Sequence, residues 1–453
     1  MLQKILPLVF VSSLRFLGLF IVLPVISLYA VSFKASAAMM GLAVGGAYLT
    51  QILCQTPIGI LSDKYSRKKV VLWCLGVFVV GSFLCFIAHN IQTLVIGRLI
   101  QGMGAMGGVL SAMIADLVEE EKRTHAMAMM GAGIFFSFTA AMVIGPSIGM
   151  RFGVQWLFML TTLLTLASML LMAFKVPEPP KIIYTLKEKP RLLDALKNKD
   201  IFIINSCSFF EKCLMTLIFV LIPLALVHEF KMDKGVLWKI YTAGAALGMV
   251  SMAPAAIIAE KFHKAKGVLL SGVFLFLLAY ACLAYADRHA NSPTTWLFLA
   301  GIMCFFAGFG TLEPIMQSLA SKFAKAHQRG LVLGMFVSYG YVGSFVGGML
   351  GGMGYTYLGV EKVAILVVVV CVLWLGLVSL LSNPSRQKNV YFPLDAFDRE
   401  KFKTIETQVG IIEWYINESQ NTIIVKYDAL QTSEEQIIEL SVGFRKGAQS
   451  GIY

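Results

Sequence analysis

The sequence predicts an all-α membrane protein with twelve transmembrane helices in two six-helix repeats, followed by a small α+β domain of the ferredoxin-like type. Three observations support this prediction. Of the 453 residues, 57% are apolar and only 14% are charged, whereas a soluble protein carries about a quarter charged residues. Apolar runs of membrane-spanning length recur along the chain. After residue 382 the composition changes to that of a soluble segment.

Twelve apolar runs are the predicted spans. Their predicted limits are 5–31, 38–61, 70–88, 93–117, 125–149, 154–175, 200–227, 236–259, 267–286, 295–321, 331–356 and 362–381. The first run is too long for the apolar part of a signal peptide and contains Arg15, so we expect a retained first helix. The predicted units are an N-terminal half at 1–176, a linker at 177–199, a C-terminal half at 200–382, a second linker at 383–389 and a tail domain at 390–453.

The loops predict the orientation of the chain. The loops on one side, beginning with 62–69, hold nineteen Lys and Arg residues, and the loops on the opposite side hold six. Because Lys and Arg concentrate in cytoplasmic loops, we expect both termini and the 177–199 linker in the cytoplasm. The same bias accounts for the net charge of +12, which is therefore not an indication of nucleic-acid binding.

Internal similarity supports two equivalent halves. Three features recur at one offset of 206 residues, and each recurrence falls in the equivalent span. The pairs are Gly102-Met103-Gly104 with Gly308-Phe309-Gly310, Arg123 with Arg329, and Gly145 with Gly351. Such repeats are typical of secondary transporters, whose two halves surround a site near the membrane midplane.

The tail reads as alternating strands and helices. We predict strands at 390–394, 410–416 and 422–427, a helix at 398–407, and a second helix capped by Thr432 or Ser433. With a short last strand near 450–453, this order is that of a ferredoxin-like domain. The tail has no Cys or His, so a regulatory or assembly role is favoured over metal transfer.

Three motifs carry a family resemblance. The first is the loop between the second and third spans, Gly59-x-Leu61-x-Asp63-Lys64-x-x-Arg67-Lys68. The others are Arg98-Leu99-Ile100-Gln101-Gly102-x-Gly104 in the fourth span and Gly145-Pro146-Ser147-Ile148-Gly149 in the fifth. Over residues 1–382 the chain resembles the major facilitator superfamily, and the third motif is similar to the pattern of its exporters. Ser66 and Met150 stand where that family usually has glycine.

A narrower resemblance is to the YajR-type drug-efflux subgroup of that superfamily. It rests on Arg15-Phe16-Leu17-Gly18 with Leu23-Pro24, on Arg123-Thr124-x-Ala126-Met127-Ala128, and on the appended tail domain. This resemblance implies a proton-driven exporter in a bacterial inner membrane. The residues alone indicate only a secondary transporter.

The loop at 62–69 is the predicted conformational latch. Asp63 can pair with Arg67 one helical turn away, and Asp116 is a second candidate acid for Arg67. The resemblance implies that Gly59, Asp63, Lys64, Arg67 and Lys68 latch against the eleventh span when the transporter faces outward, with Arg329 at the start of the receiving helix. The alternative is a simple positively charged anchor.

Charged residues inside the spans are the predicted coupling and substrate residues, since such residues are costly in a membrane and usually functional. They are Glu313, Glu211, Lys212, Arg15 and Arg98. An apolar surrounding favours the protonated form of a carboxylate, so Glu313 is the leading candidate for proton carrier and Glu211 the second. A structural ion pair remains open for Glu211 and Lys212, and a structural role remains equally open for Arg98.

Glycines in the eleventh span form two adjacent stripes, one at Gly343, Gly347 and Gly351 and another that includes Gly348 and Gly352. This spacing allows close helix packing, either static or as a sliding surface.

We therefore expect a proton-coupled antiporter of small amphipathic molecules or drugs, working by alternating access. The alternatives are a sugar or metabolite transporter, with or without proton coupling, and a transporter-like membrane sensor that signals through its tail. We expect no enzyme activity, no metal and no cofactor, with the proton gradient as energy source. The expected partners are membrane lipid, a small-molecule substrate and, for the tail, a cytosolic ligand or protein; we expect a monomer and no nucleic acid.

Overall fold

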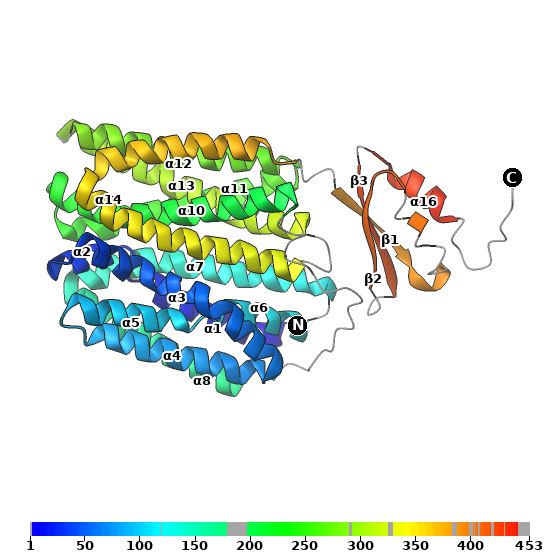
Figure 1. Cartoon of the computed structure of the whole chain (residues 1–453), viewed down its shortest axis with the longest axis horizontal. Coiled ribbons are helices and arrows are strands. Elements are labelled where there is room, and N and C mark those ends of the chain that lie inside the picture. The colour runs from blue at the N-terminus through cyan, green and yellow to red at the C-terminus, as the bar shows by residue number, and fades with distance from the viewer. Residues whose placement is uncertain are drawn as a thin grey trace.

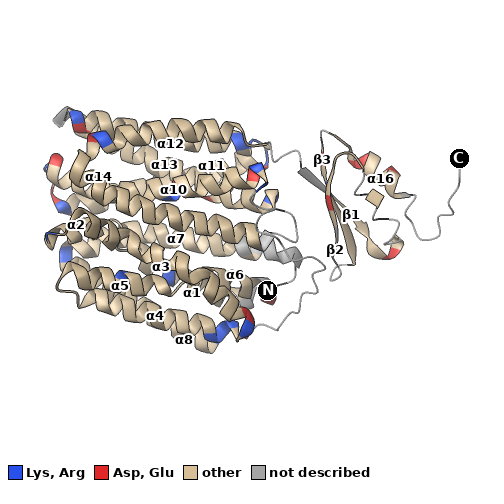
Figure 2. Ribbon diagram, in the orientation of Figure 1, with Lys and Arg blue, Asp and Glu red and all other residues tan. Residues whose placement is uncertain are grey.

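The computed structural model describes residues 2–118, 120–178, 197–289, 292–324, 329–382, 387–397, 402, 404–405, 408–417, 421–429 and 431–442. Its long helices form one bundle, and a small domain lies beyond one end of that bundle (Figure 1). We call this end of the bundle the tail end and the opposite end the far end. Charged residues gather at these two ends, and the middle of the bundle is almost free of them (Figure 2).

The N-terminal half contains the helices up to residue 175. They are α1 (Leu2–Phe20), α2 (Ile26–Ser32), α3 (Ala37–Lys64), α4 (Arg67–Phe86), α5 (Ile91–Met103), α6 (Gly107–Leu117), α7 (Glu120–Phe152) and α8 (Val154–Lys175). The C-terminal half contains α10 (Lys199–Leu224), the π-helical turn η1 (Ala225–Glu229), the short η2 (Lys234–Val236), α11 (Leu237–Glu260), α12 (Ala265–Arg288), α13 (Ser292–Phe323) and α14 (Arg329–Ser379).

These helices confirm the twelve predicted spans. Ten described helices are long and apolar enough to cross a membrane, and α1 supplies a shorter apolar helix. The last of the ten, α14, is two helices joined at Gly359, whose φ of 79° is outside the helical range. Glycine adopts this backbone conformation without steric cost, so the chain reverses there and returns to the tail end.

Two predicted spans are broken rather than continuous. The first span unwinds between α1 and α2, where Pro24 provides no backbone donor. The fourth span is interrupted after Met103, and Gly104 is the C-cap of α5. A Cβ at Gly104 would lie 2.6 Å from the carbonyl oxygen of Cys74, so the break lets the helix approach α4 closely.

The glycine repeat corresponds to equivalent packing in the two halves. A Cβ at Gly145 in the fifth span would lie 2.1 Å from the carbonyl oxygen of Ile21 in the first span. A Cβ at Gly351 in the eleventh span would lie 2.9 Å from Val220 in the seventh. The fifth span therefore packs on the first as the eleventh packs on the seventh.

The two halves meet through α3 and α14 near the far end. A Cβ at Gly348 would lie 2.8 Å from the backbone nitrogen of Gly45, and one at Gly352 would lie 2.6 Å from that of Gly41. Toward the tail end of α3, a Cβ at Gly59 would meet no described atom of another element within 4 Å. The glycine contacts between α3 and α14 are therefore confined to the far half of the bundle.

The tail is a small α+β domain. Its strands β1 (Gln387–Pro393), β2 (Ile411–Asn417) and β3 (Thr422–Asp428) form an antiparallel sheet in the order β1-β3-β2. Helix α16 (Glu434–Val442) begins at a capping box, in which the Gln436 amide donates to the Ser433 hydroxyl and the Ser433 amide donates to the Gln436 side chain. The predicted strand near 450–453 and most of the helix at 398–407 lie outside the described residues.

Candidate functional site

A charged triad lies in the middle of the C-terminal half. The Lys212 ammonium lies 3.2 Å from Glu211 Oε2 and donates a hydrogen bond to Glu313 Oε2. Lys212 and Glu211 are neighbours on α10, and Glu313 comes from α13. Glu211 is fully buried, whereas the Lys212 and Glu313 side chains are 21% and 33% exposed. The structure thus brings together three of the five intramembrane residues that the sequence singled out.

The triad is unequal in its hydrogen bonding. Both oxygens of the Glu211 carboxylate are buried without a hydrogen bond among the described residues. The Lys212 ammonium also lies 5.0 Å from the centre of the Phe309 ring, at cation–π distance. One ammonium is therefore shared by two carboxylates, through a hydrogen bond to Glu313 and an ion pair with Glu211.

Aromatic rings connect the triad to the N-terminal half. The Phe138 ring on α7 lies 4.9 Å from that of Phe309 on α13 and 5.9 Å from that of Phe219 on α10. A change in the relative position of the halves must rearrange these rings. Phe309 was not predicted as a functional residue; its place four residues before Glu313 on one helix was the available signal.

Arg15 is the fourth intramembrane charge, and the structure places it in the N-terminal half on α1. It is 1% exposed, and none of its three guanidinium nitrogens makes a hydrogen bond to a described residue. The guanidinium lies over the rings of Phe16 and Phe78, at 4.7 and 5.2 Å. Tyr341 and Tyr48 interact electrostatically with this guanidinium, and no sequence pattern singled out Tyr48.

Arg98 has very different surroundings. It donates to the backbone oxygens of Ala43 and Val44 on α3 at 3.0 and 3.3 Å, and to Gln101 Oε1. Gln101 in turn donates to the Ser82 hydroxyl at 2.9 Å. These bonds hold α5 against α3 and α4, so the geometry gives Arg98 a structural role within its half.

Within the segment 62–69, α3 ends at Lys64 and α4 begins at Arg67, so a two-residue turn joins the two helices. The Arg67 guanidinium lies 3.5 Å from Asp63 and 3.0 Å from Asp116, so both predicted ion pairs are present. Ser66 accepts a hydrogen bond from the Lys69 amide and caps α4. This cap explains how serine is accommodated where the family usually has glycine.

Three other latch residues, Lys68, Lys64 and Gly59, lie in the same half as this loop. Lys68 donates to the carbonyl oxygens of Ala173 and Val176 at the end of α8, at 2.8 Å each. Lys64 lies near the ring of Tyr65, and Gly59 is on the open part of α3. Arg329 begins α14, but its side chain is outside the described residues. The latch itself stays a prediction.

The export-type motif packs on the break in the first span. Gly145 approaches the Ile21 carbonyl, as described above. A Cβ at Gly149 would lie 3.0 Å from Leu157 and 3.3 Å from Val25. Pro146 lies inside α7 between these glycines, so the motif joins the fifth span to the unwound segment between α1 and α2.

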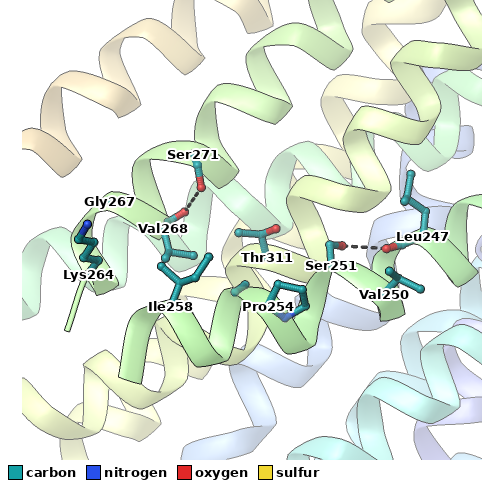
Figure 3. Close-up of a pocket in the computed structure, with 11 residues that line it drawn as sticks. Leu247, Val250, Ser251, Pro254, Ile258, Lys264, Gly267, Val268, Ser271 and Thr311 are labelled. Atoms are coloured by element: carbon teal, nitrogen blue, oxygen red, sulfur yellow. Dashed lines mark hydrogen bonds between the residues drawn. The ribbon is translucent and has the colours of Figure 1, made fainter. Parts of the chain in front are cut away.

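A pocket of about 470 Å³ lies between α11, α12 and α13 (Figure 3). Apolar side chains such as Leu247, Val250 and Ile258 line it and are themselves exposed on the bundle surface. Thr311 lines it from α13, two residues before Glu313. Residues two apart on a helix point in nearly opposite directions, so this groove and the triad lie on different faces of α13.

Comparison with known proteins places the chain in a family. The family model described as Major Facilitator Superfamily matches residues 8–284 and 204–414. The inner membrane transport protein YajR of Escherichia coli strain K12 is 30% identical over 435 residues, which cover 94% of each chain. The multidrug resistance protein MdtH of Aeromonas salmonicida is 25% identical over 76% of this chain and 84% of its own.

Solved structures share the fold. The crystal structure of a bacterial homolog of the human lysosomal transporter Spinster, in an inward-facing and occupied conformation, superposes with a TM-score of 0.65. It is 14% identical and covers 83% of this chain and 96% of its own.

Proposed function

The chain belongs to the Major Facilitator Superfamily, and from that premise we propose that it is a proton-coupled antiporter that exports small amphipathic molecules by alternating access. The observation that carries this proposal is the triad of Glu211, Lys212 and Glu313 in the middle of the bundle. The similarity to MdtH, a multidrug resistance protein, supports the choice of drugs or similar molecules as substrates.

The charge of the triad explains how exchange would work. With both carboxylates ionised, the triad carries a net charge of −1, and with one protonated it is neutral. Two carboxylates this close titrate as a pair rather than independently. Either a proton or a positively charged group of the substrate can neutralise the second carboxylate, and they exclude one another there. Mutual exclusion of proton and substrate is the requirement for antiport.

The partial exposure of the triad supports access from one side at a time. Lys212 and Glu313 remain accessible, while the glycine contacts of α3 and α14 lie in the far half of the bundle. We propose that the tail end faces the cytoplasm of a bacterium and that the protein is a monomer in the inner membrane. The proton gradient then replaces any cofactor as the source of energy.

The first prediction concerns Glu313. Reconstituted vesicles with an imposed pH gradient are screened with dyes, drugs and sugars until one substrate moves against its own gradient. In Glu313→Gln, uphill movement is expected to cease because the side chain no longer releases a proton, while downhill exchange of the same substrate continues.

A second measurement separates a coupled transporter from a membrane sensor. Addition of substrate to the purified protein is expected to release protons if the protein is a coupled transporter.

The matched control is Glu361→Gln. Glu361 lies outside the triad, with its carboxylate 3.8 Å from Arg288 at the far end, and its replacement is expected to leave uphill transport intact. Proton-driven uphill transport that persists in Glu313→Gln would refute the assignment of the proton carrier.

A further inference from the structure

The unusual feature of Arg15 is a buried positive charge without an acidic partner among the described residues. All three guanidinium nitrogens lack a hydrogen bond among the described residues, at 1% exposure. No acidic side chain of the described part of the chain forms an ion pair with it. Burying an uncompensated charge is costly, and cation–π contacts with two rings offset only part of that cost.

Other buried and unsatisfied polar groups lie on α1, which carries Arg15, and on α3, whose Tyr48 interacts electrostatically with Arg15. The Tyr48 hydroxyl, both amide atoms of Gln51 and the Ser12 hydroxyl are buried without a hydrogen bond among the described residues. Ser12 is on α1 with Arg15, and Tyr48 and Gln51 are one turn apart on α3. Buried polar groups are normally paired, so unpaired donors on these two helices, together with an unpaired guanidinium, indicate a place for an anionic acceptor.

This place lies at the interface between the halves. Tyr341 comes from α14 in the C-terminal half and interacts electrostatically with both Arg15 and Lys212. Tyr48 on α3 interacts with Arg15, Arg98 and Lys212, and its ring stacks on Tyr341 at 6.3 Å. The Arg15 charge and the triad therefore face one another across two tyrosines, one from each half.

We propose that the central site binds a zwitterionic amphipathic substrate, whose anionic group binds Arg15 in the N-terminal half and whose cationic group lies against Glu211 and Glu313 in the C-terminal half. Separation of α14 from α3 would uncover Arg15, because Tyr341 belongs to the moving half. This inference rests on the proposed function, since it names the substrate class of the same site.

The substrate needs a cationic group as well as an anionic one, because antiport requires the substrate to displace the proton. An anion alone would add negative charge near two carboxylates and would favour their protonation, so that proton and anion would move together. A cationic group beside the carboxylates displaces the proton instead. Among the described residues, the titratable groups that interact with the carboxylates are Lys212 and Cys207 on α10, and Tyr341 on α14 and Tyr48 on α3 interact with Lys212. Lys212 is the positive charge among these groups.

The test uses the full chain purified in detergent and three matched probes. They are the zwitterion para-aminomethylbenzoate, the anion para-methylbenzoate and the cation para-methylbenzylamine. Binding is followed by calorimetry in a weak buffer, with a pH indicator for proton release. The zwitterion is expected to bind about tenfold or more tighter than either single-charge probe, with release of a proton. Arg15→Met is expected to remove this advantage, and Arg15→Lys to retain part of it.

A second measurement does not depend on any probe. Because no acidic side chain of the described residues pairs with Arg15, Arg15→Met is expected to unfold at a higher temperature than the wild type in the absence of ligand. The matched control is Arg98→Met, which removes a guanidinium with three hydrogen bonds and is expected to unfold at a lower temperature.

The outcomes separate this inference from the proposed function. Unchanged zwitterion affinity in Arg15→Met, absence of binding by all three probes at millimolar concentration, or an Arg15→Met variant as unstable as Arg98→Met would each overturn the inference and leave antiport standing. Preferred binding of para-methylbenzoate with proton uptake would overturn both, because anion and proton would then be transported together.

Discussion

Arg67 is held by two acids whose surroundings differ sharply. The Asp63 side chain is 73% exposed and 3.5 Å away, whereas that of Asp116 is 5% exposed and 3.0 Å away. Exposed ion pairs contribute about 0–1 kcal/mol. Removal of one partner from a buried pair costs about 3–5 kcal/mol, because it leaves an uncompensated charge.

The prediction is that Asp116→Asn destabilises the protein by roughly 3 kcal/mol and that Asp63→Asn changes its stability by about 1 kcal/mol or less. Thermal unfolding in detergent measures both. Equal effects would contradict the assignment of Asp116 as the anchoring acid.

The latch has a separate test in Asp63→Asn. Transport by this variant is measured in parallel with cysteine accessibility from each side of the membrane. Unchanged values in both measurements would refute the latch.

The two arginines of the spans show the limit of residue-level prediction. Arg15 and Arg98 each interrupt an apolar run, and composition treats them alike. Arg98 donates to backbone oxygens of α3, and no local sequence pattern predicts these partners. Arg15 instead contacts aromatic rings, and hydroxyls on α1 and α3 are left without hydrogen bonds among the described residues. By contrast, the pair of Asp63 and Arg67 was predictable, because its geometry depends on helical spacing alone.

At the scale of helices, α14 presents two glycine faces with different partners. A Cβ at Gly347 would lie 2.0 Å from the carbonyl oxygen of Cys213 on α10, in the same half. A Cβ at Gly348 would lie 2.8 Å from the backbone nitrogen of Gly45 on α3, in the other half. The sequence left static packing and sliding open; the structure places one glycine face within the C-terminal half and the other between the halves, where sliding stays a prediction.

The matched substitutions are Gly347→Ala and Gly348→Ala. The first is expected to lower thermal stability by roughly 1–3 kcal/mol, because it overpacks a fixed interface. The second is expected to increase the distance between the far ends of α3 and α14, with a smaller loss of stability, because the halves can separate. Pulsed electron paramagnetic resonance between labels on those ends measures the distance. A Gly348→Ala variant with an unchanged distance would show that the contact is not a moving surface.

For the whole molecule, the twelve spans, the two halves and the tail strands followed from the sequence because burial in a membrane or a sheet imposes a period and a length. The breaks in the first and fourth spans did not. The first break lies where Pro24 meets Gly145 of another helix, and the second lies where Gly104 meets Cys74 of another helix. The contact between the tail and the bundle was equally hidden, because it joins residues about a hundred positions apart.

That contact links the tail to the helix that carries Glu313. The Lys426 ammonium on β3 donates to the carbonyl oxygens of Lys322 and Ala324 at the end of α13, at 2.6 and 3.3 Å. Glu413 on β2 lies 4.0 Å from the same ammonium. The strands of the tail lie between the bundle and α16 (Figure 1). A cation at the C-terminus of a helix satisfies its last carbonyls and its dipole.

We expect Lys426→Gln to release the tail from α13. Hydrogen bonds to charged groups contribute about 1.5–3 kcal/mol, so the amides of the last turn of α13 should exchange about tenfold faster or more. Hydrogen exchange read by mass spectrometry measures this, with Lys426→Arg as the variant that retains the charge and Lys264→Gln as a control in the loop before α12. If exchange at the end of α13 is the same in Lys426→Gln and the wild type, the tail does not dock there. If it rises and the transport rate changes with it, the tail acts on the same helix that positions the proton carrier.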